Sequence, residues 1–181
     1  MTYNELLEQA RQEVGPYCKA CPVCNGKACK NQMPGPGAKG VGDTAIRNYE
    51  KWQEIRLQMD TIGKNQKADT TFNVFGKTFR YPLFAGPVGA VNLHYGKKYN
   101  DESYNNILVS ACAEAGIAAM TGDGVNENVM QVATEAIKKA NGIGIPTIKP
   151  WDMEKIKEKM KLADASGAFA VAMDIDASGL P

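Results

Sequence analysis

The sequence predicts an α/β protein in which short parallel strands alternate with helices. From Tyr81 onward, apolar segments of strand length alternate with segments of helical period, and a fourth strand is reached before the chain stops at Pro181. These strands are apolar on both faces, as expected where helices cover a parallel sheet. The pattern excludes an all-β domain and a helical bundle. It leaves open whether the units form half of a closed barrel or an open doubly wound sheet.

Size and composition indicate an ordinary globular protein. The chain has 181 residues, of which 44% are hydrophobic and 23% charged, so it is long enough to bury a core. The net charge of +1 does not favour binding to nucleic acid or to an anionic membrane. No apolar run approaches the roughly 20 residues of a membrane span, and the polar N-terminus is unlike a signal peptide. We therefore expect a cytoplasmic protein with reduced cysteines.

The first 42 residues are predicted to form a separate N-terminal region. Thr2-Tyr3-Asn4-Glu5 has the form of a capping box, which opens a helix that should end near Glu13. Residues 17–42 are rich in Cys, Gly and Pro and have no helical or strand period. Asp43 then begins a second helix as its N-cap. Apolar residues recur along that helix at Ile46, Tyr49, Trp52, Ile55 and Met59.

Residues 43–181 are predicted to carry the repeating units. A hairpin is expected at Thr71–Phe75 and Thr78–Arg80, turning at Gly76-Lys77. The four parallel strands are expected at Leu83–Ala85, Ile117–Met120, Ile145–Lys149 and Ala168–Asp176. The helices between them are expected at Asp101–Glu114, which ends at Gly116, at Asn126–Lys139, and after Asp152.

Four cysteines lie in one short loop of the N-terminal region. Cys18, Cys21, Cys24 and Cys29 have the spacing C-x2-C-x2-C-x4-C. Four thiolates can complete a tetrahedral zinc site or bind the irons of a 4Fe–4S cluster. Free thiols on a flexible segment are the simpler alternative, but the loop then has no evident folding force. The overlapping spacing is closer to a ferredoxin run than to paired zinc knuckles, which favours the iron–sulfur cluster.

The strand ends carry the second group of candidate functional residues. Chemistry in α/β proteins gathers at the C-terminal ends of parallel strands. Each of these ends alone resembles an ordinary turn, in which Gly and Asp are common. Together, a Lys and a Trp at one end and glycine-lined turns at two others favour a site for a planar anionic cofactor. The four ends are residues 85–90, residues 121–124, Lys149-Pro150-Trp151, and Asp174-Ile175-Asp176.

Three groups of residues between Gly42 and Asp176 match short motifs of a known family. They are Gly42-Asp43-Thr44-Ala45-Ile46-Arg47-Asn48, Phe75-Gly76 with Pro82-Leu83-Phe84-Ala85-Gly86, and Ala115-Gly116-Ile117 with Thr121-Gly122-Asp123. Over this range the chain resembles the FMN-dependent α-hydroxy-acid oxidase and dehydrogenase family, which includes glycolate oxidase and lactate oxidase. The resemblance implies the N-terminal half of a TIM (β/α)8 barrel that binds FMN over its strand ends. The cysteine loop is not part of the common family pattern.

The resemblance also implies roles for individual residues. Lys149, Trp151 and Asp174 stand where the family has Gln, Tyr and Thr, and the family's early substrate-binding Tyr has no clear match. Trp151 would lie on the substrate side. The catalytic residues are unknown, since the family's catalytic His and substrate-binding Arg residues lie on later strands. The implied cofactor-binding residues are Pro87, Val88, Gly89, Gly122, Asp123, Lys149 and Asp174.

The resemblance therefore implies an FMN-dependent oxidoreductase that acts on a small 2-hydroxy acid such as lactate or glycolate. An iron–sulfur cluster beside the flavin would favour a dehydrogenase that passes electrons onward. This chain by itself is expected to be inactive. Two alternatives are a metal-stabilised, non-catalytic assembly module and another FMN barrel, similar to the type 2 isopentenyl diphosphate isomerase. Because strands one and four would be open edges, we expect pairing with a complementary half barrel or with a second copy.

Overall fold

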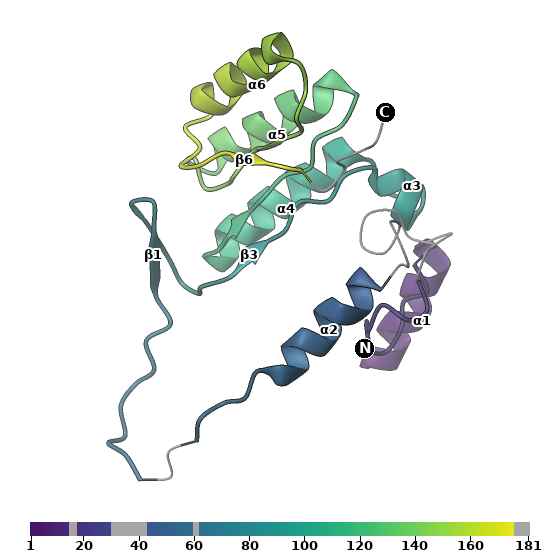
Figure 1. Cartoon of the computed structure of the whole chain (residues 1–181), viewed down its shortest axis with the longest axis vertical. Coiled ribbons are helices and arrows are strands. Elements are labelled where there is room, and N and C mark those ends of the chain that lie inside the picture. The colour runs from purple at the N-terminus through teal and green to yellow at the C-terminus, as the bar shows by residue number, and fades with distance from the viewer. Residues whose placement is uncertain (15–17, 30–42, 60–61, 176–181) are drawn as a thin grey trace. The chain divides into compact units, whose positions relative to one another are not determined.

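The computed structural model describes residues 1–14, 18–29, 43–59 and 62–175 (Figure 1). The chain divides into two compact units. The first comprises Met1–Ala68 and Asn92–Lys98, and the second comprises Asp69–Val91 and Tyr99–Pro181. Across the described ranges, no helix combines the length and apolar character needed to cross a membrane.

The first unit contains two of the predicted helices. Helix α1 spans Tyr3–Glu13, and its capping box is confirmed by the reciprocal hydrogen bonds between Thr2 and Glu5. Helix α2 spans Thr44–Glu54. Asp43 is its N-cap residue, as predicted, although its side chain makes no capping hydrogen bond. The helix ends before Met59, because the backbone is already extended at Ile55. A short helix α3, Val91–Tyr95, was not predicted.

The second unit begins with the predicted hairpin, but its turn lies at Phe75-Gly76, one residue before the predicted Gly76-Lys77, because Lys77 already pairs with Val74. Strands β1, Phe72–Val74, and β2, Lys77–Phe79, pair antiparallel. Both central turn residues, Phe75 and Gly76, have positive φ angles of 48° and 77°, as a two-residue type I′ turn requires. Phe79 is only 3% exposed. Its ring lies 5.3 Å from that of Phe84 and 5.4 Å from that of Phe169, so these contacts fix the hairpin to the repeating units.

Four short parallel strands follow, all within longer segments that were predicted. They are β3, Phe84–Ala85, β4, Ala118–Ala119, β5, Thr147–Ile148, and β6, Ala172–Met173. Strand β3 pairs with β4 and β5 pairs with β6, while a parallel bridge between Met120 and Ile145 links the two pairs. The strands therefore lie in chain order, without the reversal that characterises a doubly wound sheet. The described residues form open sheets, and closure of a barrel stays a prediction.

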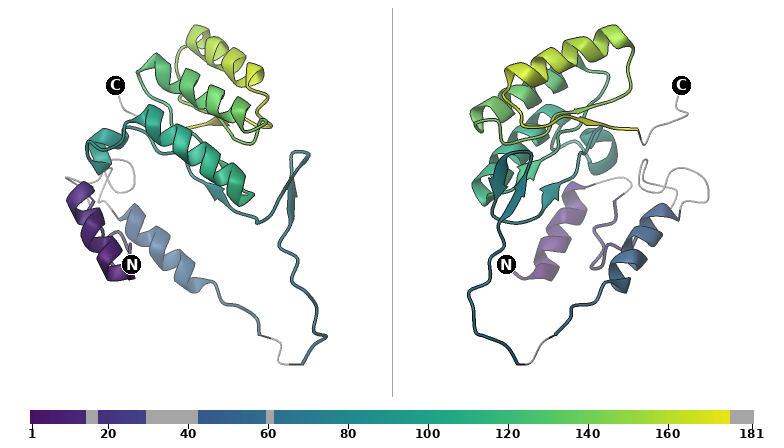
Figure 2. Two further views of the ribbon diagram at one scale, coloured as in Figure 1. Left: turned by 180° about the vertical axis from the view of Figure 1, so that it is seen from behind. Right: turned by 60° about the vertical axis from the view of Figure 1, so that its left-hand side comes forward.

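Three helices connect the strands and pack in a row. Helices α4, Asp101–Ala115, α5, Glu127–Lys139, and α6, Met153–Ala165, each contact the next, as Figures 1 and 2 show. Asn100, Asn126 and Asp152 accept hydrogen bonds at their N-termini. Gly116 closes α4 with a left-handed φ of 81°, which confirms its predicted role.

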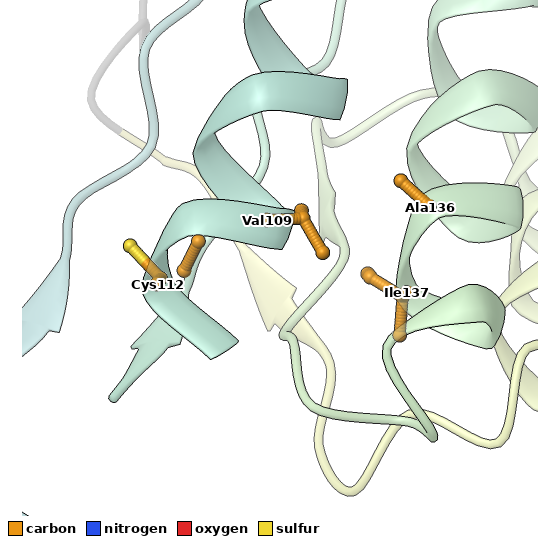
Figure 3. Close-up of a cluster of buried hydrophobic side chains, with 5 residues drawn as sticks. Val109, Cys112, Ala136 and Ile137 are labelled. Atoms are coloured by element: carbon orange, nitrogen blue, oxygen red, sulfur yellow. The ribbon is translucent and has the colours of Figure 1, made fainter. Parts of the chain in front are cut away.

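The core repeats along this row. One cluster joins α4, β4 and α5 through Val109, Cys112, Ala119, Ala136 and Ile137, four of which are labelled in Figure 3. A second cluster joins α5, β5 and α6 through Met130, Ile148 and Ala163. Each pair of consecutive helices thus buries one strand between them, which is the packing expected of successive βα units.

Candidate functional site

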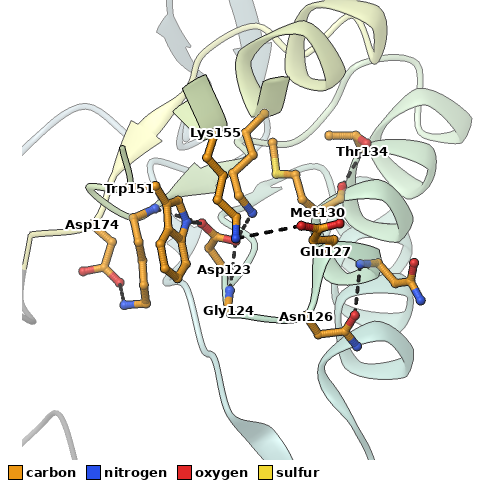
Figure 4. Close-up of polar contacts among 12 residues, drawn as sticks. Asp123, Gly124, Asn126, Glu127, Met130, Thr134, Trp151, Lys155 and Asp174 are labelled. Atoms are coloured by element: carbon orange, nitrogen blue, oxygen red, sulfur yellow. Dashed lines mark hydrogen bonds and ion pairs between the residues drawn. The ribbon is translucent and has the colours of Figure 1, made fainter. Parts of the chain in front are cut away.

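Asp123 is the centre of the polar contacts at the strand ends. It follows β4, and its side chain is fully buried. Oδ1 accepts hydrogen bonds from Gly124 N at 2.9 Å and Lys159 Nζ at 2.6 Å. Oδ2 accepts hydrogen bonds from Lys149 N at 2.9 Å and Trp151 Nε1 at 2.7 Å. This carboxylate therefore ties together the ends of β4 and β5 and the middle of α6 (Figure 4).

The surroundings of Asp123 keep its carboxyl group ionised. Burial alone raises the pKa of Asp123, because desolvation disfavours the charged form. The hydrogen bonds from Lys159, Lys149 N and Trp151, together with the charge of Lys159, outweigh that effect. The net result is a pKa below the usual value for an aspartate. The site therefore contains a buried ion pair at neutral pH.

Trp151 lies against two lysines as well as Asp123. Lys155 Nζ is 4.7 Å and Lys159 Nζ is 5.8 Å from the centre of its ring. Both distances are within the range of cation–π attraction. Lys155 also lies 4.0 Å from a carboxylate oxygen of Glu127. The indole is thus held on one edge by a hydrogen bond and over its face by positive charge.

Lys149 and Asp174 form a second ion pair where β5 and β6 end. Lys149 Nζ lies 2.8 Å from Asp174 Oδ2. Their side chains are 28% and 22% exposed, so both are accessible in part. The structure therefore brings together Asp123, Lys149, Trp151 and Asp174, which the sequence placed at three separate strand ends.

The turn after β3 approaches the turn after β4 closely. A Cβ atom on Gly122 would overlap the Val88 carbonyl oxygen, and one on Gly89 would lie 3.1 Å from the Asp123 carbonyl oxygen. Glycine at position 122 is thus required by contact between the two turns. By contrast, nothing lies within 4 Å of a Cβ built on Gly86. Open space therefore borders Gly86.

Two buried residues of this region were not predicted. Lys159 lies on the apolar face of α6 between Ile156 and Ala163, and a lysine in such a stripe is the signal that could have identified it. Asn105 of α4 accepts a hydrogen bond from Gly122 N at 3.3 Å. Its position inside a helix gave no comparable signal, because its partner comes from a distant turn.

The cysteine loop is held in place by its neighbours in the first unit. Arg11 donates a hydrogen bond to the Ala20 carbonyl at 3.3 Å, and Tyr3 donates one to the Pro22 carbonyl at 3.0 Å. Gly26 packs so closely on Ala45 that a Cβ would lie 2.5 Å from its carbonyl carbon. Residues 18–29 therefore make contacts with α1 and α2 that help to hold this loop.

The four thiols in this loop are free. Burial, followed by the nearby charges of Cys29, Cys18 and Cys21, raises the pKa of Cys24, so Cys24 lies within electrostatic range of the other three. In the part of the chain that the structure describes, however, no group of three or more His, Cys, Asp or Glu residues is arranged to hold a metal ion. The structure does not support the predicted iron–sulfur or zinc centre. Cys112 of α4 is buried in the core cluster of the second unit.

Fold and site together define an α/β protein with a polar site at the C-terminal ends of parallel strands. The family model for FMN-dependent dehydrogenase matches residues 35–181. The chain belongs to this family, and the predicted resemblance is confirmed. The match begins after the four cysteines, so the loop that contains them lies outside it. A comparison with curated proteins finds no match.

The strand-end residues fit the ring system of FMN. Open space borders Gly86, where a flat ring can lie against the backbone without a side chain in the way. The Lys149 ammonium group, partly exposed, can face the polar edge of such a ring. Asp123 differs from the other predicted ligands, because both of its carboxylate oxygens are already filled by donors from the protein.

Proposed function

We propose that this chain is part of an FMN-dependent dehydrogenase that oxidises a small 2-hydroxy acid, such as lactate or glycolate, to the 2-oxo acid. The observation that carries the proposal is the convergence of Lys149, Trp151 and Asp174 at the strand ends of a chain that belongs to the FMN-dependent dehydrogenase family. FMN supplies the capacity to take up two electrons and hydrogen from the substrate carbon, and an electron acceptor then reoxidises it.

The residues of this chain would bind and orient the flavin. In the proposal, the backbone of Pro87, Val88 and Gly89 faces the ring, and Gly122 allows that turn to approach. The Lys149 ammonium, oriented by Asp174, stabilises negative charge at the ring edge. Trp151 lies on the substrate side, where its indole excludes water from the face of the ring.

The remaining catalytic groups must come from outside the four βα units. We propose that a complementary half barrel, or a second copy of this chain, covers the edge of β6. Met173 of β6 is 53% exposed, and Ile175, which follows the strand, is 69% exposed. An exposed apolar strand edge favours pairing with another strand. Such pairing would bury the apolar side chains of Met173 and Ile175, which are exposed to solvent in the monomer.

A thiolate-bound centre in the cysteine loop is a separate part of the proposal. The spacing of Cys18, Cys21, Cys24 and Cys29 and their electrostatic proximity favour it. Since no metal-holding arrangement is present among the described residues, binding would have to draw the sulfurs together. An iron–sulfur cluster formed there would give the reduced flavin an electron acceptor.

The test of the proposed function is the protein isolated in its native assembly. We expect a flavin absorbance band between about 300 and 500 nm, release of FMN on denaturation, and bleaching of the band by lactate or glycolate under anaerobic conditions. Bound FMN that neither acid bleaches would favour a different FMN barrel, such as an isomerase of isopentenyl diphosphate. Protein that stays colourless after incubation with FMN would support an assembly module and overturn the proposal.

A further inference from the structure

We infer that Asp123 and Lys159 are a positioning pair, which holds the Trp151 indole and the Lys149 strand end at the flavin site without touching flavin or substrate. The inference deepens the proposed function and rests on it for the identity of the ligand. The geometry of the pair itself does not depend on that ligand.

The carboxylate of Asp123 links segments that are far apart in the sequence. Its partners Lys149, Trp151 and Lys159 are 26, 28 and 36 residues away. The hydrogen bond from Lys149 N fixes the backbone where β5 ends, and the bond from Trp151 Nε1 fixes the edge of the indole. The bond from Lys159 Nζ fixes α6 against these two segments (Figure 4). A shift of this carboxylate would therefore move Trp151 and Lys149 together.

Lys159 holds the carboxylate in that place. Its side chain is only 5% exposed, and it projects from a helix face that also carries Ile156 and Ala163. A buried ammonium group is unfavourable unless a carboxylate compensates it. Each member of the pair thus requires the other, and removal of one leaves a buried charge without its partner.

Exposure separates the positioning residues from the residues that can touch a ligand. The Asp123 side chain is fully buried and Lys159 nearly so, whereas Lys149 is 28% exposed. Trp151 is half-buried. A ligand at the strand ends can therefore contact Lys149 and Trp151, while the buried pair acts through them.

Trp151 itself provides a readout that needs no activity. The chain has two tryptophans, and Trp52 is 71% exposed on α2 in the other unit. In a Trp52→Phe background, the fluorescence of the full chain without added flavin reports on Trp151 alone. We would compare Lys159→Met and Lys159→Arg with the control Lys157→Met. Lys157 lies on the same helix and is exposed.

Lys159→Met is expected to shift the Trp151 emission to longer wavelength and to increase its quenching by acrylamide. Lys159→Arg should restore part of the wild-type signal, because guanidinium can also donate to the carboxylate. Lys157→Met should leave emission maximum and quenching close to wild type. Equal emission and quenching for Lys159→Met and Lys157→Met would overturn the inference.

A double variant separates positioning from folding. Asp123→Asn with Lys159→Met removes both buried charges, so it should fold even where Lys159→Met does not. Asn retains one acceptor oxygen for the three remaining donors, Gly124 N, Lys149 N and Trp151 Nε1, and we expect a Trp151 signal between those of wild type and Lys159→Met. A wild-type signal from the folded double variant would contradict the positioning role.

In the flavin-loaded assembly, a displacement of about 1 Å at the ring can lower kcat by about 100-fold, and we expect such a loss for the double variant but not for Lys157→Met. If no flavin binds to the wild type, the fluorescence comparison still decides the inference, and only the proposed function fails.

Discussion

Gly122 and Gly86 both lie in turns at the strand ends, yet their surroundings differ. A Cβ on Gly122 would overlap the backbone of Val88, whereas one on Gly86 would meet nothing within 4 Å. We predict that Gly122→Ala lowers the free energy of unfolding by about 1–3 kcal/mol, because backbone cannot give way as a side chain can. Gly86→Ala is the matched control and should have little effect on stability. Urea unfolding followed by circular dichroism measures both variants.

The two glycine variants also distinguish packing from ligand binding. Gly86→Ala should weaken FMN binding if the ring lies in the open space beside this turn. Equal stability of Gly122→Ala and the wild type would show that the two turns do not approach as closely as the structure indicates.

The low pKa of Asp123 makes stability depend on pH in the acid range. Its pKa in the folded protein lies below the value of 3.8 for a free aspartate, so the unfolded chain binds more protons there. The stabilisation by Asp123 is present above pH 3.8 and is lost as the pH falls through the folded pKa. We predict that Asp123→Asn with Lys159→Met has a shallower acid unfolding curve than the wild type, as measured by tryptophan fluorescence. A wild-type slope in this variant would mean that other carboxylates control acid unfolding.

At the scale of single elements, Asp152 sets the start of α6. Its Oδ1 accepts hydrogen bonds from Glu154 N at 3.1 Å and Lys155 N at 2.9 Å. Asp152→Ala should cost about 1 kcal/mol of stability, because two helix N–H groups lose their acceptor. Asp152→Asn keeps the acceptor and is the control. The measurement is the melting temperature of each variant. Equal melting temperatures for Asp152→Ala and Asp152→Asn would contradict the capping role of Asp152.

The backbone of the cysteine loop is anchored to α1 and α2. Within the described part of the chain, its thiols are not arranged around a metal site. We predict that anaerobic reconstitution with iron and sulfide gives about four irons and a broad absorbance near 400 nm. Replacement of Cys21 and Cys24 by Ser should abolish both, and Cys112→Ser, in the buried core of the other unit, is the control. Zinc binding without iron uptake would assign a zinc site, and uptake of neither metal would end the proposal for this loop.

For the whole molecule, the main prediction concerns association. Met173 exposes apolar surface on β6, Ile175 does so just after the strand, and Met153 exposes a similar fraction of its surface at the start of α6. If strand pairing drives association, Met173→Lys should reduce the mass measured by light scattering, because a charge on an edge strand opposes pairing. Met153→Lys should leave the mass unchanged. Wild-type chain that stays monomeric at high concentration would contradict the expected pairing.

Helices and turns were largely predictable because their signals are local. Capping residues such as Asn126 and Asp152, the periodic apolar positions and Gly116 all act within one or two helical turns. The strands proved shorter than their apolar segments, since hydrogen bonding to a neighbour, and not hydrophobicity, defines where a strand ends. The sequence predicted that α2 continues to Met59, but the helix ends at Glu54. Leu57 and Met59 are exposed, so burial of their side chains does not stabilise a further helical turn.

The sequence alone determined the α/β class, the order of its units and the family, because these depend on local periodicity and on the order of short motifs. Only the tertiary structure decided what Asp123 does. Its four donors come from three elements, and no spacing along the chain could show that they meet at one carboxylate. Tertiary packing likewise buries Lys159 of α6 in an ion pair with Asp123. Burial of its charged group is tolerated because the Asp123 carboxylate compensates the cost of desolvation.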